Sequence, residues 1–259
     1  MPSRKRRGLL LLFIVAFFLL NIAGGYFLYE YWQFKTKKAK AEKALYKAFG
    51  VNIPTNYLIY GIDVSNHQQY IHWPAVKQMS IQNIKIGFVF IKATEGLNDA
   101  DKSFKYNWKS AVENNITKGA YHYFLATKNG KAQAENFIKN VQLKKGDLPP
   151  VVDVEDLYSQ PVGLMKQRLK ECLQTLEAYY KVKPIIYTYA NFYQTNLSKE
   201  FDNYPLWVAN YLVKDRPEIA GNWLFWQHTD AANINGIITP VDMNVFNGDT
   251  AALRNILLK

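Results

Sequence analysis

Short apolar runs alternate with longer amphipathic stretches from residue 57 to the end of the chain. The runs are rich in β-branched and aromatic residues, which favours strands, and the stretches between them have the apolar spacing of helices. Eight runs are expected to form strands, at residues 58–64, 86–93, 119–125, 149–155, 184–190, 205–211, 222–228 and 241–246. Four helices are expected between them, at residues 73–81, 104–115, 130–142 and 161–181.

This order of elements predicts repeated βα units with parallel strands. The helices weaken toward the C-terminus, where residues 205–211 and 222–228 are separated mainly by loop. We therefore predict an α/β fold for residues 57–259: an irregular (β/α) barrel of the TIM type with about eight strands.

A separate apolar segment precedes the barrel. Residues 8–29 are interrupted by one strongly polar residue, Asn21, and a membrane-spanning helix needs about 20 such residues. The segment is longer than the ~7–15-residue apolar core of a signal peptide, and "NIAGGYF" is a poor cleavage site. We predict an uncleaved transmembrane signal anchor.

The flanks of this segment indicate its orientation. Residues 1–7 carry the basic cluster Arg4–Arg7, which favours a cytoplasmic N-terminus and an exported, periplasmic or extracellular body. Residues 30–56 contain a Lys-rich stretch that we interpret as an exposed helical stalk, with contact to anionic lipid head groups as an alternative. "VNIPTN" ends this pattern and leads into the barrel.

The net charge of +11 is concentrated near the N-terminus. Residues 1–50 hold ten basic and two acidic residues, whereas the rest of the chain is nearly balanced. The barrel therefore lacks the basic surface typical of nucleic-acid binding, and we expect a monomer that binds no nucleic acid. The single cysteine, Cys172, lies in a helical pattern and is expected to be a buried apolar residue.

Two carboxylates end the fourth predicted strand, in "LPPVVDVEDLY". Residues i and i+2 of a strand face the same side, about 6.6 Å apart, so Asp153 and Glu155 share a face with Val151. Like charge and partial desolvation raise the pKa of one carboxyl, which leaves one proton donor and one carboxylate. Glycoside hydrolysis requires such a pair. The alternative is structural: Asp153 caps the following loop and Glu155 pairs with a lysine.

Acids at other strand ends favour the chemical interpretation. In barrels of this type the active site lies at the C-terminal ends of the strands. Asp63 ends the first predicted strand and Asp242 lies on the eighth, so closure of the barrel brings both near the pair.

Other kinds of site have little support. The four histidines lack metal-binding spacing, and no phosphate-binding loop, dinucleotide motif or serine-hydrolase motif occurs, so we expect no metal and no cofactor. Lys92 and Glu95 are expected to form a structural ion pair. His122 fits a structural role or a substrate contact equally well, and Trp207 and Trp226 fit either the core or a cleft.

The chain resembles the glycoside hydrolase family 25 lysozymes, the Chalaropsis-type N-acetylmuramidases, over roughly residues 57–246. Eight blocks carry the resemblance in order: "YGIDVSNHQ", "FVFIKATEG", "GAYHYF", "PPVVDVE", "PIIYTY", "WVANY", "WQH" and "VDMNVF". The resemblance implies hydrolysis of the β-1,4 bond between N-acetylmuramic acid and N-acetylglucosamine in peptidoglycan.

The resemblance also implies roles for individual residues. Glu155 corresponds to the general acid, and Asp153 to its partner, described in the family either as a nucleophile or as a group that orients the substrate's 2-acetamido group. Asp63 and Asp242 correspond to other acids of the cleft. Further cleft residues implied are Tyr187, Tyr121, Trp207, Asn210 and Gln227. A chitinase-like hydrolase and a non-catalytic peptidoglycan-binding module remain alternatives; the chitinase pattern D-x-D-x-E would need an acid where this chain has Val151.

Overall fold

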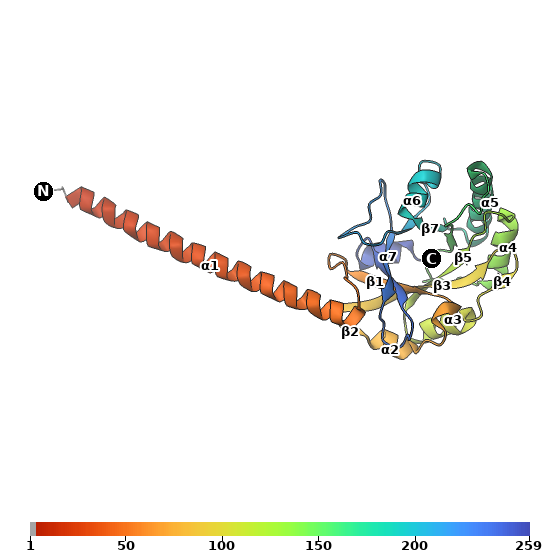
Figure 1. Ribbon diagram of the computed structural model, residues 1–259, viewed down its shortest axis with the longest axis horizontal. Helices are drawn as coiled ribbons and strands as arrows, with labels where there is room; N and C mark the ends of the chain where they lie inside the picture. The colour runs from red at the N-terminus through yellow and green to blue at the C-terminus, as the bar shows by residue number, and fades with distance from the viewer. Residues whose placement is uncertain (1–3) are drawn as a thin grey trace.

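The computed structural model describes residues 4–259 and consists of one long helix leading into a barrel (Figure 1). The helix α1 spans Arg4–Phe49 without interruption, so the predicted membrane segment and the predicted stalk form one rod. Among the described residues, α1 is the one helix whose length and composition suit a membrane span, with a mean hydropathy of 2.3 in a stretch that is not buried.

A closed barrel of eight strands forms the body, as predicted. Neighbouring strands pair in the order β1-β10-β9-β8-β7-β6-β5-β3, and the parallel pairing of β3 with β1 closes the ring. These strands are β1 (Ile59–Val64), β3 (Ile84–Glu95), β5 (Thr117–Tyr123), β6 (Val151–Asp153), β7 (Ile185–Tyr189), β8 (Leu206–Ala209), β9 (Phe225–Ala232) and β10 (Val241–Phe246).

The last strand runs in the opposite direction to the others. β10 pairs antiparallel with both β1 and β9, whereas the expectation was a fully parallel barrel. The physical reason is the short connection between β9 and β10, which has no helix to carry the chain back along the barrel. The beginning of β10 therefore lies at the same end of the barrel as the ends of the other strands.

Helices cover the first two thirds of the barrel and become short after β7, as expected. The helices and short elements around the barrel are η1 (Asn66–Gln68), α2 (Trp73–Gln78), β2 (Ser80–Ile81), β4 (Asp99–Ala100), α3 (Phe104–Glu113), α4 (Gly130–Asn140), α5 (Val162–Tyr180), α6 (Ala190–Phe192), η2 (Tyr193–Leu197) and α7 (Thr250–Ile256). Cys172 is buried on α5, in line with its predicted structural role.

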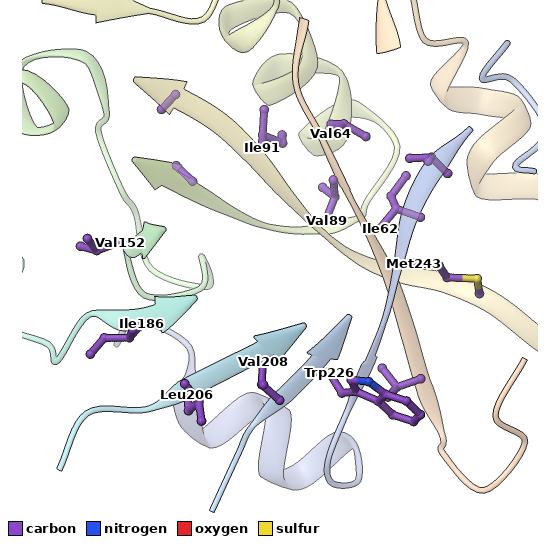
Figure 2. Packing of buried hydrophobic residues seen from close by; sticks show 14 of the residues in the cluster. Ile62, Val64, Val89, Ile91, Val152, Ile186, Leu206, Val208, Trp226 and Met243 are labelled. Atoms are coloured by element: carbon purple, nitrogen blue, oxygen red, sulfur yellow. The ribbon is translucent and has the colours of Figure 1, made fainter. Parts of the chain in front are cut away.

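Two apolar clusters reflect the two faces of the strands. Outward-facing residues of the strands pack beneath the helices, and Figure 2 shows members of this cluster on β1, β3, β6, β7, β8, β9 and β10. The barrel interior is filled by aromatic rings, among them Phe90 stacked on Trp207 with 4.3 Å between ring centroids. Gly61 and Gly119 leave room for this filling, because a Cβ there would lie 2.4 Å from Phe88 and 2.7 Å from Phe90.

The last turn of α1 packs against the barrel. Leu45 and Phe49 are buried in the outer cluster, and the Phe49 carbonyl accepts a hydrogen bond of 2.7 Å from the backbone N–H of Asn233. Gly50 follows with φ of 73°, a left-handed conformation that suits the end of a helix. The expectation of an exposed stalk therefore fails for this last turn, because one face of it carries apolar residues at helical spacing.

Candidate active site

The two acids of the fourth predicted strand lie at the mouth of the barrel. Asp153 is the last residue of β6, beside Tyr123 of β5 and Tyr187 of β7, and Glu155 follows two residues later. Val151 belongs to the interior cluster, whereas Val152 and Val154 belong to the outer one. The alternation expected from the sequence thus directs Asp153 into the barrel mouth, and Glu155 lies half-buried after it.

Asp153 and Glu155 interact electrostatically. Burial and the charge of Glu155 raise the pKa of Asp153 well above its ordinary value of 3.8. Burial also raises the pKa of Glu155, in part offset by Asp153 and Tyr189 and by the charge of Lys92. Two carboxyls coupled in this way titrate as a pair, because ionisation of one disfavours ionisation of the other. Asp153 Oδ1 is buried and has no hydrogen-bond partner within residues 4–259, which leaves it free to meet a ligand in the mouth.

Asp63 and Asp242 form a second pair of acids. They lie directly opposite each other on the antiparallel strands β1 and β10. Burial raises the pKa of Asp63, and hydrogen bonds from Asn244 and Gln227 limit this rise, so that the pKa is about 6. Burial and the neighbouring charge of Asp63 raise the pKa of Asp242 to about 8. All four acids influence one another, so the structure brings together the carboxylates that the sequence singled out.

A network of neutral donors holds Asp63 in place. Asp63 Oδ2 accepts from Gln227 Nε2 at 2.9 Å and from Asn244 Nδ2 at 2.7 Å. Gln227 Oε1 in turn accepts from the hydroxyls of Tyr187, at 2.7 Å, and Tyr211. These contacts fix the orientation of the glutamine amide, since its oxygen faces two hydroxyl donors and its nitrogen faces a carboxylate.

Trp207 forms part of the floor beneath the acids. It is 2% exposed and donates its indole N–H to Asn244 Oδ1 at 2.7 Å, so it supports Asn244 from inside the barrel. Tyr121 stands above it on β5, edge-on to the Trp207 ring. Burial and the charges of Asp63, Asp153 and Asp242 raise the pKa of Tyr121, which places its hydroxyl among the acids.

Lys92 brings a positive charge to this part of the mouth. Its ammonium lies 2.6 Å from Glu95 Oε2, which confirms the ion pair expected from the sequence, and 4.8 Å from the centre of the Tyr123 ring. The same charge acts against burial and so limits the rise in the pKa values of Asp153 and Glu155. Lys92 therefore supports the negative charge of the pair as well as anchoring its own strand.

Several residues lie outside this cluster. Asn210, expected in the cleft, accepts the backbone N–H of Glu218 through its side-chain oxygen at 2.7 Å. His122 is fully buried, contacts Thr94 and Gln133 rather than an acid, and has its pKa lowered to about 4 by burial. Trp226 is buried in the outer cluster, which favours its interpretation as core.

Three further residues of the site were given no role from the sequence, although Tyr189 and Asn244 stand among the polar residues of the predicted strands. Tyr211 and Asn244 enter through their contacts with Gln227 and Asp63, and Tyr189 stands beside Glu155 with its pKa raised to about 12 by burial and nearby acids. The period-two spacing from Tyr187 to Tyr189 was an available signal for Tyr189. Tyr211 lies just past β8 but within the predicted strand 205–211, so its period-two spacing from Trp207 was an available signal as well.

Comparison with known proteins identifies the family of this chain. The family model described as "Glycosyl hydrolases family 25" matches residues 62–237. The chain is 42% identical to the uncharacterized protein YegX of Escherichia coli O6:H1, over 82% of this chain and 78% of that protein. It is 33% identical to lysozyme M1 of Streptomyces globisporus, over 75% of this chain and 70% of that one.

A solved structure gives the same result. The family 25 glycosyl hydrolase from Bacillus anthracis superimposes with a TM-score of 0.71 and 33% identity, covering 78% of this chain and 94% of the other. The barrel, its acidic mouth and these relatives lead to one conclusion: the chain belongs to the glycosyl hydrolases of family 25 and is a glycoside hydrolase of the lysozyme and muramidase type.

Proposed function

We propose that this protein is a membrane-tethered N-acetylmuramidase that cleaves the β-1,4 bond between N-acetylmuramic acid and N-acetylglucosamine in peptidoglycan. Membership of the family supports peptidoglycan hydrolysis. The observation that carries the finer proposal is the carboxyl pair at the mouth of the barrel, the buried Asp153 and the half-buried Glu155, whose pKa values are both raised by burial.

In this proposal Glu155 is the general acid. It donates a proton to the glycosidic oxygen as the bond from that oxygen to C1 breaks, and positive charge develops on the sugar ring. Asp153 stabilises this charge as a carboxylate, directly or by orienting the substrate's 2-acetamido group. Burial and the charge of Glu155 raise the pKa of Asp153, whereas the positive charge that develops on the sugar ring favours an ionised Asp153 and so a proton on Glu155. The oxygen of a water molecule then forms the new bond at C1, and a proton of that water returns to Glu155.

The remaining residues line and support the cleft. We assign Asp63 and Asp242 to contacts with the sugar on the side of the mouth opposite β6, and Tyr121 to the wall between the acids. The proposed positions of Tyr187, Trp207 and Gln227 are supporting ones, because their polar atoms contact the network beneath Asp63. Asn210 shapes the loop after β8.

The apolar helix α1 supports a tethered location. We propose that residues 8–29 anchor the chain in a membrane, with residues 1–7 in the cytoplasm and a monomeric barrel exported to the periplasm or the outside of the cell. Length and composition of α1 are the support for this assignment.

The test uses purified peptidoglycan and the full chain in a non-ionic detergent. New reducing ends, identified by mass spectrometry, are expected to be N-acetylmuramic acid. Glu155→Gln is expected to lower their release at least a thousandfold while the protein still sediments with peptidoglycan, and Glu135→Gln, an exposed acid on α4, is the matched control. Reducing ends of N-acetylglucosamine would contradict the bond assignment, and wild-type binding without any turnover would favour a binding module.

A further inference from the structure

A second cavity lies at the end of the barrel away from the acids. It has a volume of about 550 Å³, and its floor is made of apolar residues that begin or precede strands: Pro149, Ile185, Pro205 and Leu224. The acids of the active site lie at the other ends of these strands, as Asp153 does on β6. A ligand in this cavity therefore leaves the catalytic mouth open.

The rim of this cavity is basic. Lys144, Lys145, Lys181 and Lys183 line it, Lys259 lies beside them, and no aspartate or glutamate is among the lining residues. Elsewhere on the barrel, some lysines are paired with acids, as in Lys109–Glu113, Lys131–Glu135 and Lys170–Glu200. Within residues 4–259, none of the four rim lysines has a carboxylate within salt-bridge distance. Charges of one sign around a low-dielectric floor concentrate the field and attract an anion.

The walls that carry these lysines are held in place. Two backbone hydrogen bonds of 2.9 Å join Gly146 and Asp147 to Leu258, and the Asp147 carboxylate accepts the backbone N–H of Lys144 and pairs with the buried Lys118. Asp147 is thus fully engaged beneath the rim and leaves the rim charges uncompensated. On the other wall the Lys183 ammonium rests on the Asn203 carbonyl at 3.0 Å. The backbone that carries the rim lysines is therefore held in place, while their side chains are exposed around the cavity.

We propose that this cavity binds a phosphate-bearing anion, with the phosphate among the four lysines and any apolar part of the ligand on the floor. Four uncompensated ammonium groups exceed what one carboxylate neutralises, which favours a multiply charged group. Lysine binds phosphate as a compact point charge. The residues that line the cavity include no arginine, whose planar guanidinium group would favour a carboxylate bound through two parallel hydrogen bonds. Both a soluble polyphosphate and a phospholipid head group offer this chemistry.

The test titrates sodium tripolyphosphate into the full chain in a non-ionic detergent, by calorimetry at low salt. The triple variant Lys145→Gln, Lys181→Gln, Lys183→Gln is expected to bind at least tenfold more weakly than the wild type. The matched control, Lys109→Gln, Lys131→Gln, Lys170→Gln, removes the same charge from other exposed positions and is expected to stay within twofold. Added sodium chloride weakens the wild-type interaction because exposed charges are screened.

A second arm replaces tripolyphosphate with dihexanoyl phosphatidic acid, a lipid whose phosphate monoester carries up to two negative charges, and so separates the two sources of phosphate. Binding of either probe that is lost in the rim variant supports the site, and the tighter probe identifies the source. Equal loss in the control variant, or no binding of either probe by the wild type, would overturn the proposal. Circular dichroism melting of each variant establishes that the charge changes leave the barrel folded. The outcome is independent of the muramidase assay, since no rim lysine belongs to the active site.

Discussion

At the scale of single residues, the raised pKa of Asp242 is expected to lower the unfolding free energy of the protein at neutral and higher pH. This pKa is raised from 3.8 to about 8 by burial and by Asp63 directly across the strand pair. Between these values the folded protein binds a proton that the unfolded chain releases. The unfolding free energy therefore falls as pH rises from about 4 through about 8.

Asp242→Asn is expected to remove this penalty. The variant should unfold like the wild type at pH 4 and be more stable by about 2 kcal/mol at pH 8.5, an amount reduced for the coupling to Asp63. Urea unfolding of the full chain at both pH values measures the difference. Glu135→Gln, an exposed change on α4, is the control and should leave the pH dependence unaltered. An unaltered slope in Asp242→Asn would show that Asp242 ionises freely in the folded state.

Gln227 is the residue on which the position of Asp63 depends. Its side chain donates to Asp63 and accepts from Tyr187 and Tyr211. Gln227→Leu keeps the approximate size but removes all three hydrogen bonds. We expect the pKa of Asp63 to rise above about 6 and the unfolding free energy to fall by about 1–3 kcal/mol.

Carbon-13 NMR titration of the labelled aspartate carboxyls measures this shift. Gln133→Leu supplies the control, because Gln133 is equally buried but binds the backbone of Leu125 on the other side of the strands. The control should lose stability without moving the titration of Asp63. The same shift in both variants would mean that the network acts through general loosening of the barrel.

The sequence identifies the acids but not what holds them. Asp153, Glu155, Asp63 and Asp242 stand out because carboxylates are unusual at the ends of apolar strands. Asn244, Tyr211 and the amide orientation of Gln227 depend on contacts between strands that are far apart in the chain. Those contacts require the register and direction of β10, which a period-two pattern does not specify.

At the scale of elements, the strands and main helices follow from the sequence. β10 occupies residues 241–246 as expected, and α5 lies within the predicted range 161–181. The direction of β10 does not follow, because alternation is the same for parallel and antiparallel strands. Its short link to β9 was the available signal, since a parallel pair needs a crossover of about a dozen residues or more, usually with a helix.

The end of α1 is the other difference at this scale. The Lys-rich composition favoured a solvated helix, but the last turns of this helix also carry an apolar face with Leu45 and Phe49, which are buried. Phe49→Ala is expected to lower the unfolding free energy of the full chain by about 3 kcal/mol, since a buried phenyl ring is replaced by a cavity. Tyr46→Ala, on the exposed face of the same turn, should change it by less than about 0.5 kcal/mol. Urea unfolding compares the two variants, and equal effects would show that α1 does not dock on the barrel in solution.

At the scale of the whole molecule, the docking of α1 makes the proposed tether a rigid spacer. The helix is continuous from the apolar segment to Phe49, where the Asn233 hydrogen bond and the buried ring fix it to the barrel (Figure 1). Residues 30–49 rise about 30 Å along a helix axis. The proposed anchor would therefore hold the catalytic mouth at a set height above the membrane.

The length of α1 should then control this height. Insertion of the helical heptad Glu-Ala-Ala-Ala-Lys-Glu-Ala after Lys40 is expected to raise the barrel by about 10 Å, while seven Gly and Ser residues at the same point should give a broad range of heights. Energy transfer from a dye at Lys109→Cys to labelled lipid head groups measures the distance in liposomes. The position is exposed, and the natural Cys172 is buried with its thiol pKa raised, so it does not compete for the dye. A wild-type chain as broadly distributed as the Gly-Ser variant would contradict the rigid spacer and leave the barrel on a loose tether.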